Sequence, residues 1–461
     1  VDISGTIGIP VALKIACREE VHKRDAGGVK LNVRDEREAR SAYRDIMSRF
    51  RDYTSAVVSV QRMAPPGVEV IVGVTRDPDF GPVLMFGLGG IFSEVLNDVV
   101  FRVLPLRERS VFEMIEEIKG YRLLNGYRSA RSDIIALKDL LLRVSDLAMN
   151  NPEISELDLN PVFVYPSGYL VADARIRING TTPVPRESTS TNNYLREMFY
   201  PDTVAVLGAS DSPGKLGFNV MTNLLNHHFP GKVFPVNARK QRILGLRSYT
   251  SILDIEVPVD EAIIIVPAKA VPKAIEDCCK KGVKFIIVES AGFAETGREG
   301  REVQSHIKEL IEKTGCRLLG PNCSGLINTH HNMVQSIGVI GPLRKGKVGL
   351  IAQAGVYAAG ILTGLRNVVD FGIIATIGNK MDVDESEILE CMGKDPNISV
   401  IAMYMEDVSG GRRFMNTAKS ISRSKPVIVL KSGRTEEGKN GVSTHTASLA
   451  GNDVVNSAAF R

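Results

Sequence analysis

The stretch 204-VAVLGASDSPGKLGFNVMTNLL-225 has the pattern of a buried strand, a glycine-rich turn and an amphipathic helix. The residues before Gly208 are apolar and mostly β-branched, which is typical of a strand covered on both faces of its sheet. Glycines in such a turn let the backbone approach a phosphate, and the helix N-terminus after it supplies N–H donors. The spacing departs from GxGxxG, so the turn fits either a nucleotide-like ligand or a tight turn without a ligand.

The next predicted strand narrows the choice of nucleotide. In 233-VFPVNARKQRILG-245 that strand is followed by Arg239, Lys240 and Arg242. NAD sites place an acidic residue there to bind the ribose, whereas cations suit a phosphorylated ribose. The segment therefore favours coenzyme A or NADP over NAD.

Strand and helix patterns alternate along the chain. Apolar runs predict strands at 68–74, 203–209, 261–268, 283–291, 347–353, 398–406 and 425–431. Helices are predicted over 270–282 and 299–315, and both segments end in glycine. Strand–helix–strand repetition predicts an α/β protein with parallel, doubly wound sheets.

Two segments interrupt this alternation. Residues 179–193 are rich in Pro, Ser and Thr and lack apolar periodicity, which predicts a linker. Before the linker the pattern is mixed α+β, and 161-PVFVY-165 with 169-YLVADARI-176 predicts a hairpin. A second boundary, between two α/β units, is expected within 326–346.

Length and composition bound the class of protein. The 461 residues predict about three domains, and the contents of 44% hydrophobic and 24% charged residues are ordinary for globular chains. The net charge is only +4 and no basic block is interleaved with aromatics, so nucleic-acid binding is not expected. No membrane-spanning run or signal-peptide pattern is present, and we expect a cytoplasmic protein without membrane contact. The six cysteines lack CxxC spacing and are expected to be small buried residues in a reducing compartment.

The segment 156-ELDLNPVFVYPSGYLVADARI-176 contains candidate metal ligands. Asp158 and Asn160 share one face of a strand because they are two residues apart, and Asp173 lies on the partner strand. Oxygen ligands on neighbouring strands suit Mg²⁺ bound together with substrate phosphates. Half-buried sheet edges also carry such residues, so both interpretations remain open.

A single histidine, His445, lies in 443-STHTASLAG-451, after a Gly- and charge-rich run. Its neighbours do not have the pattern of a hydrophobic core. It is either a solvated loop residue or a nucleophile or proton carrier presented at a loop tip.

Several of these segments together resemble the NDP-forming (ADP-forming) acyl-CoA synthetases, which are relatives of succinyl-CoA synthetase. The resemblance covers nearly the whole chain. It is carried by 22-HKRDAGGVKLNV-33, 76-RDPDFGPVLMFGLGGIFSEVLNDV-99, 204–217, 290-SAGFAETG-297, 320-GPNCSGLIN-328, 378-GNKMDVD-384 and 443–451. It implies a partial α+β ATP-grasp domain (1–178), a linker (179–195), a CoA-binding Rossmann-like domain (196–328) and a flavodoxin-like succinyl-CoA-ligase domain (329–461).

The resemblance implies that His445 becomes a phosphohistidine. It would carry phosphate between an acyl phosphate at the CoA site and the nucleotide at the ATP-grasp site. Glu406 matches the acid that orients this histidine, and His22 matches a relay histidine near the nucleotide. The two sites are far apart in relatives, so the loop 433–444 is expected to move.

The resemblance also implies the remaining binding residues and the substrates ATP/ADP, CoA and phosphate. ATP would be bound by Lys14, Gln61, Met63 and Glu69, and Mg²⁺ by Asn160 and Asp173. CoA would be bound by Gly208, Ser210, Gly214, Lys215, Gly217, Asn237, Lys240 and Pro267. The phosphate on the histidine would dock at Gln353, Ala354 and Gly355, at a helix N-terminus.

The sequence departs from the family pattern in several places. Many relatives carry SQSG where this chain has 352-AQAG-355, so both serine hydroxyls are gone while the N–H groups of the helix remain. The loop carries HTA in place of HTG, and HKRD replaces HKSD. The chain is expected to begin inside the ATP-grasp domain and to lack a further α/β domain, and the ATP-grasp domain precedes the CoA-binding domain.

The expected reaction is acid + CoA + ATP ⇌ acyl-CoA + ADP + phosphate, on a short-chain or hydroxy carboxylic acid, by a homodimer. The acid pocket is expected near 320-GPNCSG-325 and the helix after Gly355. The alternatives are a succinate- or GTP-type ligase, a degenerate CoA- or nucleotide-sensing module, and an NAD(P) dehydrogenase based only on the glycine-rich turn.

Overall fold

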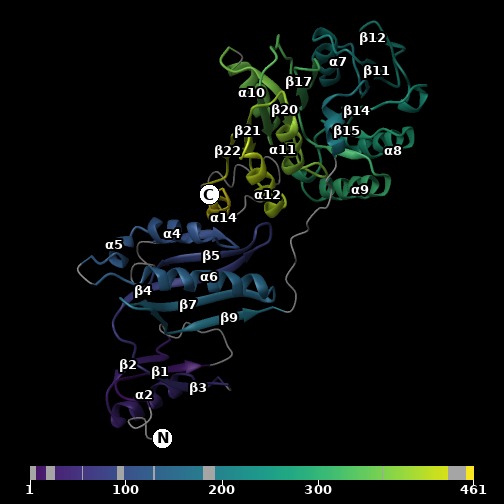
Figure 1. The fold of residues 1–461 in the computed structure, drawn as a ribbon. Helices are drawn as coiled ribbons and strands as arrows, with labels where there is room; N and C mark the ends of the chain where they lie inside the picture. The colour runs from purple at the N-terminus through teal and green to yellow at the C-terminus, as the bar shows by residue number, and fades with distance from the viewer. Residues whose placement is uncertain are drawn as a thin grey trace. The chain divides into compact units, whose positions relative to one another are not determined.

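The chain folds into two compact units, shown in Figure 1. The computed structural model describes residues 7–16, 26–53, 55–90, 98–127, 130–179, 193–365, 367–434 and 453–460. The first unit consists of Val1–Thr75 and Leu84–Gly180, and the second of Arg76–Val83 and Thr181–Arg461. Within the described ranges, no helix is both long enough and apolar enough to cross a membrane. Most of the predicted linker (179–195) lies outside these ranges, and the short 3-10 helix η1 (Asn193–Phe199) begins within its last residues.

The first unit begins with a small antiparallel sheet. It consists of β1 (Val11–Ala16), β2 (Val29–Val33) and β3 (Val57–Arg62), in the order β2-β1-β3. Helix α2 (Glu36–Arg49) packs with the buried side chains of Val11, Leu13 and Ile15. Because side chains alternate across a strand, Lys14 lies on the opposite face of the sheet. Gln61 lies on that face too, because it pairs with Ala12.

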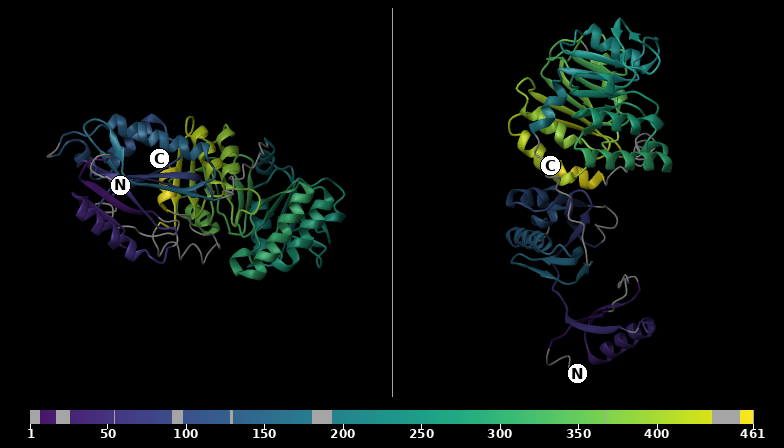
Figure 2. Two further views of the ribbon diagram at one scale, coloured as in Figure 1. Left: turned by 90° about the horizontal axis from the view of Figure 1, so that it is seen from below. Right: turned by 90° about the vertical axis from the view of Figure 1, so that its right-hand side faces the viewer.

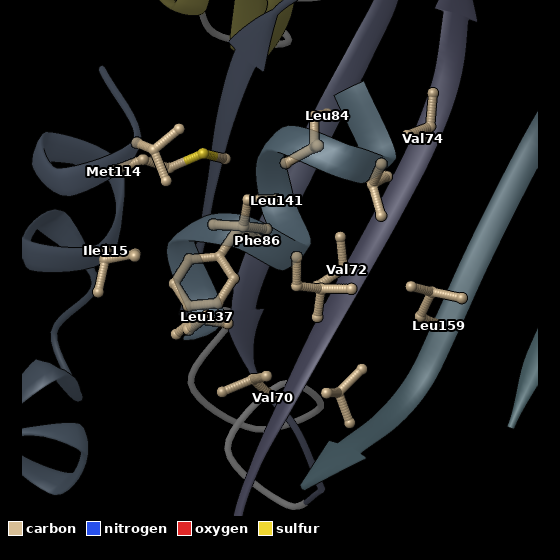
Figure 3. Packing of buried hydrophobic residues seen from close by; sticks show 14 of the residues in the cluster. Val70, Val72, Val74, Leu84, Phe86, Met114, Ile115, Leu137, Leu141 and Leu159 are labelled. Atoms are coloured by element: carbon tan, nitrogen blue, oxygen red, sulfur yellow. The ribbon is translucent and has the colours of Figure 1, made fainter. Parts of the chain in front are cut away.

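A second sheet forms the larger part of this unit. Its strands are β4 (Val68–Asp77), β5 (Gly81–Leu88), β6 (Val99–Val103), β7 (Ile154–Val164), β8 (Tyr169–Val171) and β9 (Ala174–Ile178). The order is β6-β5-β4-β7-β8, with β9 also paired to β7. The helices are α4 (Glu108–Glu117), α5 (Tyr121–Leu124) and α6 (Ile134–Asn150). Figure 3 shows the core between them, where Val70, Val72 and Phe86 meet Met114 and Leu141.

The predicted hairpin around residues 166–168 is present, but its second strand is broken in two. β7 pairs with β8 and then with β9, and the ladder is interrupted opposite Pro161. Proline has no N–H to donate, so a continuous ladder cannot pass this position. The interruption leaves Ala172 and Asp173 between the two short strands.

The second unit contains two sheets, and the first is entirely parallel. Its strands are β10 (Thr203–Leu207), β11 (Lys232–Val236), β14 (Glu261–Ile264), β15 (Phe285–Val288) and β16 (Arg317–Leu319), in the order β11-β10-β14-β15-β16. The connecting helices are α7 (Leu216–Asn226), α8 (Val271–Lys281) and α9 (Arg298–Thr314), and a ribbon of β12 (Arg242–Ile243) and β13 (Leu246–Arg247) follows β11. Helices α8 and α9 lie side by side (Figures 1 and 2) and end at Gly282 and Gly315, which are left-handed. The parallel, doubly wound arrangement predicted from the sequence is confirmed.

The last sheet has six strands. They are β17 (Gly325–Asn328), β18 (Met333–Ser336), β19 (Val348–Ala352), β20 (Phe371–Thr376), β21 (Val400–Met405) and β22 (Val427–Lys431), in the order β18-β17-β20-β19-β21-β22. The last four are mutually parallel, whereas β17 and β18 form an antiparallel hairpin. The helices are α10 (Gly355–Leu365), α11 (Glu385–Lys394), α12 (Gly411–Ile421) and α14 (Asp453–Ala459).

The β17–β18 hairpin occupies the region where we expected a boundary between the two α/β units. β17 lies inside the segment predicted to be CoA-binding, yet it pairs only within the last sheet. The Asn223 amide of α7 donates to the carbonyls of Ser336 (3.0 Å) and Gly338 (2.7 Å), and the Asn219 amide donates to that of Ile337 (2.8 Å). The hairpin therefore attaches the last sheet to the helix that follows β10.

Glu261 is a buried acid in the centre of the parallel sheet. It is the first residue of β14 and lies between Val204 and Phe285 of the neighbouring strands. Its exposed fraction is 0%, and neither carboxyl oxygen has a hydrogen-bond partner in the described structure. Burial, together with the charges of Asp260 and Glu289, raises the pKa of Glu261 well above its ordinary value.

We predict that Glu261→Met stabilises the protein, more at high than at low pH. The folded protein keeps a proton on Glu261 that the unfolded chain loses above about pH 4.3. The free energy of unfolding therefore falls as the pH rises from about 4.3 toward the raised pKa of the folded protein. Methionine has no titrating group and no unpartnered oxygens, so the free energy of unfolding should rise by roughly 1–3 kcal/mol at pH 8. Thermal unfolding measured at pH 5 and pH 8 tests this. Glu312→Gln, at an exposed position of α9, is the control, and an equal gain at both pH values would contradict the prediction.

Candidate active site

The glycine-rich turn after β10 brings a strand end and a helix start into direct contact. Gly208 has a φ of +94°, and its N–H donates to the Val236 carbonyl (3.1 Å). A Cβ on Gly208 would overlap the Ile265 carbonyl, and one on Gly217 would overlap the carbonyl of Gly208. Only glycines permit this approach, so the first turn of α7 lies directly against the end of β10.

This turn lies at the position where the strand order reverses. The chain passes from β10 to β11 on one side and to β14 on the other, and ligands of doubly wound sheets bind in the crevice at this point. The Asn237 amide after β11 donates to the Ala209 carbonyl (2.9 Å), and the buried Ser210 hydroxyl accepts from the N–H of Ser212 (3.1 Å). Pro267 follows β14 at the same edge of the sheet.

The structure also places the charged candidates of this turn. Lys215 is the N-cap residue of α7 and follows Gly214, which has a φ of +88°. Lys240 forms an ion pair with Asp211, whose pKa is lowered by this hydrogen bond. The residues predicted for CoA therefore surround one strand–helix turn, and the Lys240 ammonium is already paired with a carboxylate there.

In the first unit, the sheet face opposite α2 meets the interrupted hairpin. The Lys14 ammonium of β1 donates to the Ala172 carbonyl (2.7 Å). The next residue, Asp173, accepts the Asn160 N–H through its own carbonyl (3.2 Å). Burial and the charge of Asp173 raise the pKa of Asp158, while Arg175 opposes them. Lys14 therefore lies in one region with Asn160 and Asp173, which were predicted from a different segment.

The other residues predicted for ATP lie on two different parts of the first unit. Gln61 lies on the same sheet face as Lys14, and Met63 extends β3 with an N–H bond to the Pro10 carbonyl (3.0 Å). Glu69 of β4 instead approaches the glycine run after β5, since a Cβ on Gly90 would lie 3.1 Å from its Oε2. Among the described residues, no group of three or more His, Cys, Asp or Glu side chains could hold a metal ion.

His445 and His22 lie outside the described residues. The residues that flank the His445 segment are described. Arg434 and Asp453, on either side of residues 435–452, form an ion pair with a 3.2 Å distance between Arg434 Nε and Asp453 Oδ1. The chain reaches this pair from β22, whose Lys431 ammonium donates to the Glu406 carbonyl (2.7 Å). The two ends of the segment are therefore held together, and its first end follows a strand that borders Glu406.

Glu406, directly after β21, is held by the side chain of Gln353. Glu406 is 3% exposed. The Gln353 amide oxygen accepts from the N–H groups of Glu406 (2.8 Å) and Asp407 (3.1 Å), and its amide nitrogen donates to the Asp407 carboxylate. The side chain of Gln353, a residue predicted to bind phosphate, is thus bonded to the end of β21.

A buried ionic cluster next to Asp407 was not predicted. Lys380, 3% exposed as a side chain, pairs with the carboxylates of Asp407 and Glu385. Burial alone would lower the pKa of Lys380, but these two acids outweigh it and raise that pKa. Burial raises the pKa of Glu385 to about 7, against the effect of Lys380. The segment 378-GNKMDVD-384 was a sequence signal for this cluster, but it did not indicate which acids Lys380 would meet.

The first residue of α10 packs against a serine from another segment. A Cβ on Gly355 would overlap the Ser324 hydroxyl, so this hydroxyl lies at the helix N-terminus. The Ser324 N–H donates to the Thr376 hydroxyl (2.7 Å), which donates to the Gly325 carbonyl (2.8 Å). Although 352-AQAG-355 lacks serine, a hydroxyl group is present beside Gly355. Ala354 is buried between Gln353 and Gly355.

Comparison with known protein families assigns three successive segments. The ATP-grasp domain matches residues 1–178, the CoA binding domain matches 202–329, and the succinyl-CoA ligase like flavodoxin domain matches 345–461. This order of α+β and α/β domains agrees with the fold class expected from the sequence.

The chain is similar to named acyl-CoA ligases. It is 44% identical to the ADP-forming acetate–CoA ligase II of Archaeoglobus fulgidus, over 99% of this chain and 67% of that protein. It is 32% identical to the ADP-forming 4-hydroxybutyrate–CoA ligase of Nitrosopumilus maritimus, over 55% of this chain and 37% of that protein.

Among solved structures, it resembles the acetyl-coenzyme A synthetase 1 of Ca. Korarchaeum cryptofilum in complex with phosphate and ADP. The TM-score is 0.56 at 36% identity, covering 58% of each chain. The three domain matches and the 44% identity across almost the entire chain lead to one conclusion. The chain belongs to the ADP-forming acyl-CoA synthetase family, within the succinyl-CoA synthetase superfamily.

Proposed function

We propose that this chain takes part in the reaction acid + CoA + ATP ⇌ acyl-CoA + ADP + phosphate, through a phosphohistidine at His445. The observation that supports this most directly is the arrangement around Glu406. Gln353 and Lys431 hold this acid at the edge of the last sheet, next to the strand from which the His445 segment departs. We propose the domain boundaries 1–178, 196–328 and 329–461, with a linker at 179–195, for this machinery.

In the thioester-cleaving direction, phosphate attacks the acyl-CoA carbonyl carbon, the thiolate of CoA leaves, and an acyl phosphate forms. A neutral ring nitrogen of His445 then attacks phosphorus, and the acid leaves as a carboxylate. Glu406 would accept the N–H of the other ring nitrogen and so fix the tautomer and stabilise the developing imidazolium. ADP finally takes the phosphoryl group from the histidine, and ATP forms.

The CoA and phosphate groups would be bound at two helix N-termini of the second unit. We propose Gly208, Ser210, Gly214, Lys215, Gly217, Asn237, Lys240 and Pro267 for CoA. The N–H groups at the start of α7 and α10 point toward the carboxyl edges of their sheets, where they favour anions. Ala354 and Gly355 would support the phosphate through their backbone N–H groups. Gln353, also proposed for this site, would position the turn, because its N–H donates to the Tyr404 carbonyl (2.9 Å) and its side chain bonds residues 406 and 407.

The nucleotide would occupy the sheet face that carries Lys14 and Gln61. We propose Lys14 for the phosphates, Gln61 and Met63 for the adenine, Glu69 nearby, and His22 as a relay. Asn160 and Asp173 fit Mg²⁺ by their chemistry, because amide and carboxylate oxygens are its preferred protein ligands. When bound, Mg²⁺ would neutralise charge on the transferred phosphoryl group.

We propose a short-chain or hydroxy carboxylic acid as substrate, because the relatives named above act on acetate or 4-hydroxybutyrate. A succinate- or GTP-type ligase is the alternative, and thioester formation over a panel of acids with ATP and GTP separates the two. We also propose a homodimer, although Pyrococcus furiosus relatives carry names of separate alpha and beta subunits.

We predict that His445→Ala abolishes both acyl-CoA synthesis and phosphorylation of the protein. Wild-type protein incubated with ATP and Mg²⁺ should carry an acid-labile, base-stable phosphate, because phosphorus is bound to nitrogen. Phosphopeptide mapping locates it, and His306→Ala, in the exposed part of α9, is the control. Full synthesis by the His445 variant would contradict the proposal. Binding of CoA without any phosphorylation of the wild-type chain would favour a sensing module.

We predict that Gln353→Met lowers the rate of His445 phosphorylation by up to about a hundredfold, because Glu406 loses the bonds that position it. Gln335→Met is the matched control. Gln335 is equally buried in the same sheet, but its amide bonds Leu326 and Glu289 instead. Both variants should be less stable by roughly 1–3 kcal/mol, since each leaves buried groups unpaired. Equal loss of phosphorylation in the two variants would show that Gln353 acts through stability alone.

We predict that Lys14→Ala weakens ATP binding on the order of tenfold or more, because a charged hydrogen-bond donor is lost. CoA binding should not change. Lys30→Ala is the control, because Lys30 of the adjacent strand forms an ion pair with Asp45 (2.6 Å) on α2. Thermal shifts with ATP and Mg²⁺ or with CoA measure both affinities. An unchanged ATP shift in the Lys14 variant would remove this residue from the proposed site.

A further inference from the structure

Two thiols that are far apart in the sequence lie against each other in the second unit. The sulfur atoms of Cys279 and Cys316 are 3.0 Å apart, although 37 positions separate the two residues. Cys279 belongs to the last turn of α8, and Cys316 lies between the end of α9 and the start of β16. The side-by-side packing of α8 and α9 brings them together. Cys316 is 6% exposed, whereas Cys279 is partly exposed and accessible to a small molecule.

The surroundings of the pair favour a thiolate near neutral pH. The hydrogen bond between the thiols lowers the pKa of Cys316 to about 7 and raises that of Cys279. The Thr314 hydroxyl lies 3.3 Å from the Cys279 sulfur, and the Cys316 thiol is 3.2 Å from the Val283 carbonyl. Burial instead raises the pKa of Cys391 to about 12, and also that of the buried Cys278. Among the described cysteines, thiolate reactivity is therefore concentrated at this pair.

We propose that Cys279 and Cys316 form a modification site that small-molecule disulfides convert to an intramolecular disulfide. The Cys279 thiol passes its proton to the adjacent Cys316 thiolate as its sulfur attacks the small disulfide, a mixed disulfide forms, and one small thiol leaves. The Cys316 sulfur then attacks the Cys279 sulfur, and the second small thiol leaves. The two thiol protons end on the two released thiols, so the protein loses two electrons and the small disulfide gains them. Reaching a bonded S–S distance requires an approach of only about 1 Å.

The location of the pair determines what this bond changes. It ties the C-terminal end of α8 to the start of β16, at the edge of the parallel sheet where the strands begin. The Gly208 turn lies at the opposite edge, where the strands end. Oxidation should therefore stabilise the second unit, because the disulfide closes a loop and lowers the conformational entropy of the unfolded chain. The turn proposed to face CoA should keep its structure.

The test uses the full chain carrying Cys17→Ser, because Cys17 lies outside the described residues. After reaction with oxidised glutathione at pH 8, the protein should lose two thiols and a mass of two hydrogens. Peptide mapping should link residues 279 and 316. The thermal midpoint should rise on the order of 5 °C and return to its starting value with dithiothreitol.

Single variants separate the two steps. Cys316→Ser should stop with one glutathione on Cys279, and Cys279→Ser should form no intramolecular disulfide. Cys391→Ser, at an unreactive thiol, should behave like the parent. Retention of all thiols, a parent protein that stops at the mixed disulfide, or a link to another cysteine would overturn the proposal. None of these readouts depends on acyl-CoA synthesis, so the result is independent of the proposed function.

Discussion

The side chain of Gln353 joins two strands at the edge where the candidate site lies. β19 and β21 are parallel neighbours whose last paired residues are Ala352 and Tyr404, and the Gln353 N–H donates to the Tyr404 carbonyl (2.9 Å). The Gln353 side chain continues this contact beyond the strands, because its amide oxygen accepts the N–H groups of residues 406 and 407. A buried amide with all its partners is rigid, and removal of one partner leaves several polar groups without compensation. The position of Glu406, and the start of α10 beside it, depend on this bridge.

Polar side-chain contacts connect the two large sheets of the second unit. Asn219 and Asn223 of α7 bind carbonyls after β18, and Arg317 of β16 binds Asp382 (2.9 Å) and Glu387 (2.8 Å) from the last sheet's helices and loops. Burial lowers the pKa of Arg317 by itself, but these two carboxylates reverse the effect and raise it. The glycine-rich turn after β10 and the Glu406 region therefore belong to one unit, in which side-chain hydrogen bonds connect the two sheets.

Glycines in the sequence correctly predicted where helices end and where the chain turns tightly. Gly282 and Gly315 end α8 and α9 because a left-handed residue there is natural only for glycine, and the Gly208 turn follows from the same property. The interruption opposite Pro161 was missed, although proline in a central strand is a recognisable signal.

The roles of Gln353, Lys380 and Cys316 were not accessible to sequence patterns. Gln353 and Lys380 both meet Asp407, which is 54 and 27 positions away, and Cys316 meets Cys279, which is 37 positions away. Only the folded sheet order brings these residues together, although the second partner of Lys380, Glu385, is close in sequence. Family resemblance named Glu406 and Gln353 but did not show that one holds the other.

The position of α14 limits where His445 can lie, because a short stretch of chain connects the two. Asp453 is eight positions after His445, and a fully extended chain spans at most about 3.3–3.6 Å per residue. As long as α14 stays in place, His445 cannot lie more than about 26–29 Å from the Cα atom of Asp453. In the proposed mechanism, every group that exchanges phosphate with His445 must come within this distance, plus the length of a histidine side chain, of the start of α14.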